Sequence, residues 1–220
     1  MRDFAANGDI YVILPMQQDR LAERSADEFP LLREVHHRMA NTLALLTTQL
    51  WDEFGTSRAP QVRRSLTRFE ARIAAFGHLN RLLAVGASDR CIAVRPYVEE
   101  LCHALAEAVL TPLGVRCEVS ADEGVLRSGT CERLGLIITE LVTNAAKHAF
   151  TGLNGGVVRV ELISKPHRWL CTVSDNGAGM AMPPAKSGAR ILDDVARMID
   201  GTLVMQSGVS GTSVSVSFAG

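Results

Sequence analysis

The sequence predicts an α+β protein in which a helical hairpin is followed by a two-layer α/β sandwich. Residues 31–54 and 60–85 repeat apolar side chains in steps of three and four, which is the period of amphipathic helices. From about residue 91 the pattern changes to helix-like segments mixed with short alternating ones, as in helices packed on a mixed sheet. We therefore expect three parts: an N-terminal extension (1–28), the hairpin (29–88) and the sandwich (89–220).

Composition excludes several classes of protein. The 220 residues are 47% hydrophobic and 21% charged, which fits a folded protein with a core and argues against a disordered chain. The net charge of −1 argues against a protein that coats nucleic acid. No apolar run approaches the roughly 18 residues of a membrane span, and the first residues do not resemble a signal peptide. The five cysteines match no metal-ligand spacing. We expect a cytoplasmic protein with buried thiols, no membrane span and no nucleic-acid partner.

The hairpin is predicted from two apolar seams separated by a polar turn that ends at Pro60. The seams consist of Leu32, His36, Met39, Leu43, Leu46 and Leu50, and of Val62, Leu66, Phe69, Ile73, Phe76 and Leu83. Two helices cannot enclose their own seam, so we expect a homodimer through residues 30–86 that forms a four-helix bundle. Arg64, Arg68 and Arg72 form a basic stripe on the second helix, which is either a solvated face or a docking surface for an acidic partner.

The sandwich is predicted from the order of its segments. Pro96 is expected to open a helix that runs to about Leu110, and a short apolar stretch at Ile10–Leu14 has no assigned role. Two more helices are expected at 130–150 and 189–200, with strands at 115–120, 157–163, 168–174, 202–206 and 212–218.

A histidine pair on the first hairpin helix is the first chemical candidate. His36 occupies the seam, whereas His37 lies about 100° further round, where solvent and a partner can reach it. Glu34 and Asn41, three before and four after, share the face of His37. An imidazole nitrogen is a good nucleophile toward phosphorus when a carboxylate or amide orients the ring. A histidine pair on a helix is more often structural, so the phosphorylation hypothesis depends on other residues.

The long helix at 130–150 supplies such residues. Glu140, Asn144 and Lys147 lie along one stripe, with His148 beside them. Asn144 can offer an oxygen to Mg²⁺, Lys147 a charge to phosphate, and Glu140 can orient water. The alternative is an ordinary solvated helix face.

A third candidate ends the strand at 168–174. By strand alternation Asp175 follows Trp169, Cys171 and Val173 on the inward face, where its carboxylate needs a donor such as an adenine amino group. Gly177 and Gly179 allow a tight turn and a close backbone approach to a ligand, although a simple Asn-Gly turn would look the same. Two further candidates are Gly188, before a predicted helix N-terminus that suits phosphate, and Thr212, before the last strand.

Together these motifs resemble the core of a bacterial sensor histidine kinase, in the H-R-x-x-N branch that includes the HWE kinases. His37-Arg-Met-Ala-Asn41 matches the phosphoacceptor box, residues 140–150 the N-box and Asp175–Gly179 the first glycine box. The resemblance spans about residues 30–218 and implies a dimerisation and phosphotransfer hairpin followed by a Bergerat (GHKL) ATP-binding domain. It implies that His37 accepts the γ-phosphate of ATP and passes it to an aspartate of a response regulator receiver domain.

The same resemblance assigns site residues. It implies that Asn144 binds Mg²⁺, that Asp175 holds adenine and that Lys147 and His148 lie near the phosphates. The sequence departs from the family pattern in two places: Ala40 stands where a lysine is usual, and the second glycine box is reduced to Ser187-Gly188. The sequence thus predicts a protein-histidine kinase that uses ATP and Mg²⁺. The alternatives are a phosphotransfer relay that has lost ATP use and a non-catalytic docking module for a receiver domain.

Overall fold

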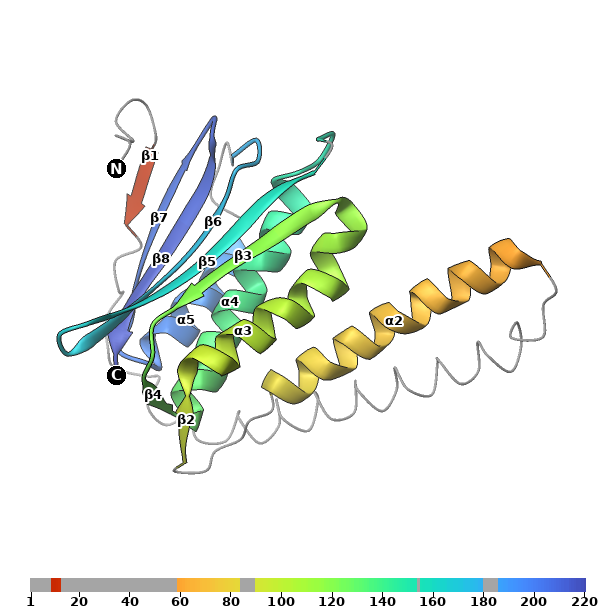
Figure 1. Cartoon of the computed structure of the whole chain (residues 1–220). Helices are drawn as coiled ribbons and strands as arrows, with labels where there is room; N and C mark the ends of the chain where they lie inside the picture. Colours follow the sequence, from red (N-terminus) through yellow and green to blue (C-terminus); the bar gives the residue numbers. More distant parts are fainter. Residues whose placement is uncertain (1–8, 13–58, 84–89, 154, 180–185) are drawn as a thin grey trace.

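A computed structural model describes residues 9–12, 59–83, 90–153, 155–179 and 186–220 (Figure 1). The first predicted helix, residues 31–54, lies outside these ranges. The second is confirmed as helix α2, Pro60–Leu83, and Pro60 is its first residue, the position where proline costs no hydrogen bond. The rest of the described chain forms the predicted α/β sandwich, which confirms the α+β class.

A six-stranded sheet forms one layer, in the order β1-β7-β8-β6-β5-β3. Only the β3–β5 pair is parallel, and the other four pairs are antiparallel. Five of the strands confirm sequence predictions to within two residues at each end: β3 (Val115–Ala121), β5 (Gly156–Lys165), β6 (Arg168–Asp175), β7 (Thr202–Gly208) and β8 (Gly211–Ala219).

Strand β1, Asp9–Val12, was not predicted as a strand. It covers part of the apolar stretch near the start of the sequence and pairs with the outer edge of β7, with Ile10 opposite Gln206 and Val12 opposite Val204. The segment that precedes the hairpin in sequence is therefore an edge strand of the sandwich.

A second small sheet was also not predicted. Strands β2 (Cys91–Ala93) and β4 (Val125–Arg127) pair antiparallel, and Ser128 N–H donates to the Arg90 carbonyl at 2.9 Å beside them. This pair joins the start of the sandwich to the residues that lead into its long helix.

Three helices form the second layer: α3 (Val94–Leu105), α4 (Ser128–His148) and α5 (Lys186–Arg197). Helix α3 begins two residues before Pro96, so the proline sits in its first turn. The helical path continues to Leu113 as predicted in outline, but as a π-helical turn (Ala106–Leu110) and a 3₁₀ turn (Thr111–Leu113) that ends at Gly114 with φ of 70°. Helices α3, α4 and α5 pack on one face of the sheet.

The core lies between these two layers. Helix α4 buries the apolar side predicted from sequence, including Leu134, Ile137 and Ile138 at 0% exposure. The strands contribute every second residue, as in Val214, Val216 and Phe218 of β8. The core buries one face of α4 and one face of the sheet. The polar residues at the C-terminal ends of α4 and β6 lie outside this core and are exposed or half-buried.

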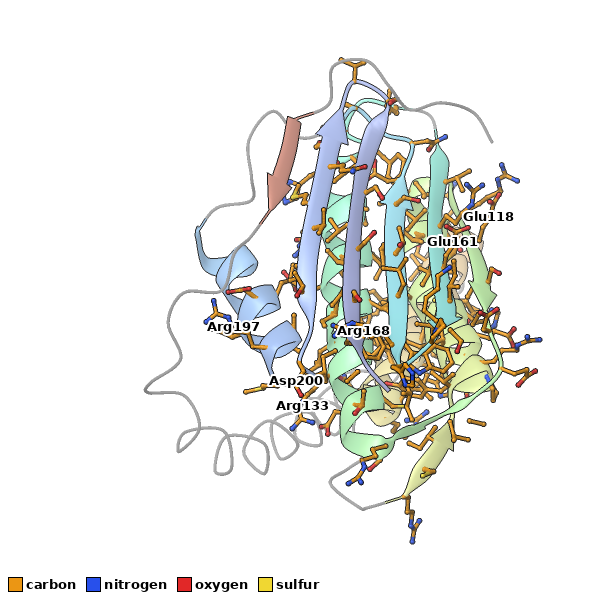
Figure 2. All side chains as sticks on the ribbon, turned by 90° about the vertical axis from the view of Figure 1, so that its left-hand side faces the viewer. Glu118, Arg133, Glu161, Arg168, Arg197 and Asp200 are labelled. Atoms are coloured by element: carbon orange, nitrogen blue, oxygen red, sulfur yellow. The ribbon has the colours of Figure 1, made fainter. Side chains whose placement is uncertain are left out.

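The opposite face of the sheet carries no helix in the described part of the chain (Figure 2). Polar side chains link neighbouring strands there. Arg159 of β5 binds Glu118 of β3 at 2.7 Å, and Thr172 of β6 bonds to Ser215 of β8 at 2.9 Å. Arg168, labelled at the lower part of Figure 2, donates to the carbonyls of Ser217 and Asp200.

Helix α2 packs against the sandwich through its C-terminal half. Leu79 is 5% exposed and belongs to the same core cluster as α3 and α4, while Phe76 and Leu82 pack against that cluster. The N-terminal end of α2 points away from the sheet in Figure 1. Val62 and Phe69 in that half are 37% and 47% exposed, so only part of the predicted seam is buried within this chain.

No helix in the described ranges is both long enough and apolar enough to cross a membrane. The prediction of buried thiols holds for Cys102, Cys131 and Cys171, whereas Cys117 is half-buried and Cys91 is exposed.

Candidate functional site

Three segments that are distant in sequence meet at one end of the sandwich. The C-terminal end of α4 contacts the loop after β6, because Ala178 N–H donates to the Ala149 carbonyl at 2.9 Å. The start of β8 contacts the end of β6, because Thr212 N–H donates to Asp175 Oδ1 at 3.3 Å. The junction therefore brings together the predicted N-box, the first glycine box and Thr212.

Asp175 is the last residue of β6 and lies on its inward face, as predicted from strand alternation. Its Oδ1 accepts hydrogen bonds from the backbone N–H of Gly177 at 2.9 Å and of Thr212. Burial raises the pKa of Asp175, and these two hydrogen bonds offset part of that rise. Among the described residues both bonds go to Oδ1, and none goes to Oδ2.

Asn176 locks the loop after β6 onto β5. Its Oδ1 accepts from Val157 N–H at 2.8 Å, and its own N–H donates to the Val157 carbonyl at 3.2 Å. The sequence alone indicates only a turn at Asn176. A buried strand followed by an Asn-Gly pair was the available signal, but the partner on β5 is 19 residues away in sequence.

The two glycines of the first glycine box are required by contacts within the chain. A Cβ on Gly177 would overlap the Ala149 carbonyl oxygen, and one on Gly179 (φ +72°) would overlap the Gly208 carbonyl oxygen. The sequence alone predicts that both glycines allow a tight turn and a close approach of a ligand. The close backbone approach in this structure is to α4 and to the β7–β8 turn, so these glycines position the site by letting three backbones meet.

Thr212 lies at this junction through both its backbone and its side chain. Its backbone N–H holds Asp175, and its hydroxyl bonds to the Ser207 hydroxyl at 3.1 Å. Thr212 and Ser207 are both buried, at 6% and 8% exposure. Ser207 was missed in the sequence, because it lies near the end of β7 with no distinctive pattern around it and its contact with Thr212 depends on the β7–β8 pairing.

The polar stripe on α4 is present as predicted. Asn144 Nδ2 donates to Glu140 Oε1 at 3.3 Å, and both side chains are half-buried. This bond directs the Asn144 Nδ2 toward Glu140, so that the amide oxygen Oδ1 faces away from Glu140. Lys147 and His148 follow at the exposed C-terminal end of α4.

Of the remaining predicted site residues, one lies at a different position from the predicted one and three lie outside the described residues. Gly188 lies inside the first turn of α5 and not before it, because the helix begins at Lys186. That position still belongs to the turn whose N–H groups have no partner within the helix. The phosphoacceptor-box residues Glu34, His37 and Asn41 lie outside the described residues.

A dedicated metal site is not built into the described residues, since no group of three or more His, Cys, Asp or Glu side chains converges there. Oxygen atoms that could contribute to binding a cation are instead the amide oxygen of Asn144 and the carboxylate of Glu140, which are neighbours on α4. Hard oxygen donors in this small number suit Mg²⁺ that is also held by a phosphate ligand.

Two family models match the chain. Residues 34–109 match the family described as histidine kinase, and residues 129–219 match the histidine kinase-, DNA gyrase B- and HSP90-like ATPase family. Both regions of the chain are thus similar to families that include histidine kinases. The described part of the second match contains Glu140, Asn144, Asp175 and Thr212, so the junction lies in the region that resembles this ATPase family.

Curated relatives agree with these matches. The chain is 25% identical over 211 residues to blue-light-activated histidine kinase 2 of Erythrobacter litoralis, covering 91% of this chain and 60% of that protein. It is 26% identical over 153 residues to the sensor histidine kinase PdtaS of Mycobacterium tuberculosis, covering 68% of this chain and 30% of that protein. The chain thus spans about a third to three fifths of the length of these relatives.

A solved structure supports the fold. The histidine kinase domain of the Erythrobacter litoralis EL346 blue-light activated histidine kinase aligns with a TM-score of 0.56 and 24% identity, covering 88% of this chain and 95% of that one. The same arrangement of a helical region followed by a mixed α/β sandwich is therefore found in an experimentally determined histidine kinase domain.

Proposed function

We propose that this chain is an ATP-dependent autokinase that phosphorylates His37 and transfers the phosphoryl group to an aspartate of a response regulator receiver domain. The observation that carries the proposal is the junction at which Asp175 and Thr212 meet beside the C-terminal end of α4, the helix that also carries the Glu140–Asn144 pair. A phosphotransfer relay binds no nucleotide. It would therefore need neither a carboxylate that accepts a hydrogen bond from adenine, as proposed for Asp175, nor an amide oxygen that binds Mg²⁺, as proposed for Asn144.

Asp175 is the residue that would recognise adenine. Its Oδ2 has no hydrogen-bond partner among the residues that the structure describes, and its Oδ1 is fixed by Gly177 and Thr212, so the carboxylate would be oriented before any ligand binds. The exocyclic amino group of adenine is a donor that matches this acceptor, whereas the carbonyl oxygen at the same position of guanine is not. The site should therefore prefer adenine to guanine nucleotides.

The end of α4 would hold the phosphates. Asn144 Oδ1 would bind Mg²⁺, which neutralises phosphate charge when bound, and the exposed Lys147 and His148 would contact phosphate oxygens. The first turn of α5, with Gly188, offers backbone N–H groups to the same ligand. We expect catalysis to come mainly from positioning and charge neutralisation.

The hairpin would supply the acceptor. His37 would attack the γ-phosphorus, and Glu34 and Asn41 on the same helix face would orient its imidazole ring. In the ATP-binding domain, Glu140 would orient a water molecule near the nucleotide. The proposal includes a homodimer through residues 30–86 and docking of the receiver domain on the hairpin, near Arg64, Arg68 and Arg72.

Incubation of the full chain with Mg²⁺ and γ-labelled ATP tests the proposal. We expect an acid-labile label that is retained in His36→Ala and lost in His37→Ala. The reason is that His36 is predicted to lie in the apolar seam, whereas His37 is predicted to lie outside it, where the γ-phosphate can reach it. Label that persists in His37→Ala would assign the phosphate to another residue and overturn this site.

The two alternatives, a phosphotransfer relay and a docking module, are distinguished by labelled ATP together with a phosphorylated receiver domain. A chain that takes no label from ATP and shows no heat of nucleotide binding, but is labelled by a phosphorylated receiver domain, is a relay. A chain that binds the receiver domain and is labelled by neither source is a docking module.

A further inference from the structure

Strand β1 covers the outer edge of β7, next to the nucleotide junction. The two strands pair antiparallel over four residues, with Asp9 opposite Ser207 and Val12 opposite Val204. Among the described elements β1 packs mainly on β7. Figure 1 shows β1 as the outermost strand, at the opposite side of the sheet from β3. Strand β1 is therefore attached to the sheet along one edge.

The end of β7 that β1 covers is the end that borders the junction. Ser207, opposite Asp9, is buried, and its hydroxyl bonds to the Thr212 hydroxyl at 3.1 Å. The Thr212 N–H donates in turn to Asp175 Oδ1 at 3.3 Å. Three consecutive contacts thus connect the pairing of β1 to the carboxylate of Asp175.

A second contact runs from the same strand end to the first glycine box. The carbonyl oxygen of Gly208 lies so near Gly179 that a Cβ on Gly179 would overlap it. A shift of the β7 end would therefore move backbone on both sides of Asp175, at Thr212 and in the glycine box.

An edge strand of four residues can leave the sheet while the rest stays folded. Its separation breaks a few backbone hydrogen bonds, and local openings of this kind cost much less free energy than global unfolding. Once β1 has left, β7 is the edge of the sheet, and its outward N–H and C=O groups face solvent. The β7 end at Ser207 is then paired only with β8.

We propose that β1 is a detachable strand that regulates nucleotide binding. Attached, it holds the end of β7 so that Ser207 and Gly208 keep Thr212 and the first glycine box in place around Asp175. Detached, it releases that strand end, and the chain binds adenine nucleotides less tightly. The part that concerns nucleotide affinity rests on the proposed function, whereas the hold of β1 on the junction can be measured without a nucleotide.

The coupling acts in both directions. If attachment of β1 raises the affinity for a nucleotide, a bound nucleotide shifts the attachment equilibrium of β1 by the same factor. A bound nucleotide should therefore slow hydrogen exchange of the β1 backbone amides, although β7 and β8 separate β1 from the strand that carries Asp175.

Ile10→Pro/Tyr11→Pro breaks the pairing. Alternate N–H groups of an antiparallel strand face its partner, so one of two consecutive residues of β1 donates to β7. Proline at both positions removes that donor, whichever residue carries it. Ile10→Ala/Tyr11→Ala is the matched control, because it changes the same two residues and keeps both N–H groups.

Amide hydrogen exchange of the full chain, followed by mass spectrometry, tests the hold on the junction. In the proline variant we expect faster exchange at Gly177 and Thr212, whose N–H groups bind Asp175. Exchange in the β5–β6 turn, at the other end of β6, should not change, and the alanine variant should exchange like the wild type. Unchanged exchange at both Gly177 and Thr212, in a proline variant whose β7 amides have lost protection, would overturn the proposal.

Calorimetric titration with ADP and Mg²⁺ tests the effect on the nucleotide. The proline variant should bind ADP about 5- to 50-fold more weakly than the wild type and the alanine variant do. Equal affinities would overturn the coupling between β1 and the nucleotide. A wild type that binds no ADP would contradict the proposed function, and exchange at Gly177 and Thr212 would still decide whether β1 holds the junction.

A disulfide between β1 and β7 tests the proposal in the opposite direction. Ile10 lies opposite the exposed Gln206. Cα atoms of opposite residues in an antiparallel pair are about 4.5–5.5 Å apart, which a disulfide can span. Oxidised Ile10→Cys/Gln206→Cys should bind ADP at least as tightly as the same variant reduced with dithiothreitol. Weaker binding by the oxidised form, or a disulfide that joins two chains, would overturn the proposal.

Discussion

Helices α2 and α4 are similar in length but differ in how their apolar faces are used. Helix α4 buries its apolar face against the sheet along its length, from Leu134 to Ala145. Helix α2 buries Ile73, Ala75 and Leu79 in its C-terminal half but leaves Val62 and Phe69 exposed. A continuous apolar seam in a sequence can therefore serve two partners, here the sandwich at one end and the expected second copy at the other.

The largest effect is expected at the centre of α4. Ile137→Ala removes a side chain with 0% exposure between the helix and the sheet, and should lower the free energy of unfolding by about 3–5 kcal/mol because a cavity remains. Urea titration followed by circular dichroism measures this change. A loss below about 1 kcal/mol would mean that α4 does not anchor the fold.

A smaller effect is expected where α2 meets the sandwich. Leu79→Ala should cost about 2–3 kcal/mol, since Leu79 joins the core from a helix that packs at its periphery. Phe69→Ala is the matched control: it should change the unfolding of a monomer by less than about 0.5 kcal/mol, but it should weaken the dimer measured by sedimentation. If Leu79→Ala and Phe69→Ala lowered the free energy of unfolding equally, the two halves of α2 would not differ in how they pack against the sandwich.

Asp175→Asn tests the site that the end of α4 helps to form, with little cost to the fold. The Asn oxygen can still accept from Gly177 and Thr212, while the charge is removed and a donor replaces Oδ2. Nucleotide-induced rises in Tm should disappear, because the new donor faces the adenine amino group.

The pH dependence of this variant has a definite sign. Burial raises the folded-state pKa of Asp175 above its ordinary value of 3.8, so the stability that its protonated form contributes is present in acid and is lost as the pH rises through the folded pKa. Asp175→Asn should therefore match the wild-type Tm in acid and exceed it at neutral pH. A Tm that falls below the wild type at neutral pH would show that the charge stabilises the fold.

The smallest effect is expected at the ion pair that joins α2 to the sandwich. His78 Nε2 lies 3.2 Å from Glu100 Oε1 of α3, and both side chains are more than a third exposed. Glu100→Gln should change the free energy of unfolding by about 0.2–1 kcal/mol, less at high salt, because water and ions screen an exposed pair. A larger or salt-independent change would indicate a role beyond this pair.

The sequence predicted those parts of the structure that depend on local pattern. The apolar spacing of α4 and the alternation that ends at Asp175 both identify the correct faces, because burial on one side imposes the period of the element. The short strands β1, β2 and β4 were missed, since three or four residues carry too little pattern and their strand character comes from distant partners. Asn176 and Ser207 were missed for the same reason, and the glycine contacts with Ala149 and Gly208 exist only when three segments are folded together.

The pairing of β1 with β7 has a kinetic consequence. Asp9 pairs with Ser207, which lies almost at the other end of the sequence. Bringing such distant segments together costs more loop-closure entropy than pairing the neighbouring strands β7 and β8. Strand β1 should therefore join the sheet late in folding, after the β7–β8 hairpin has formed.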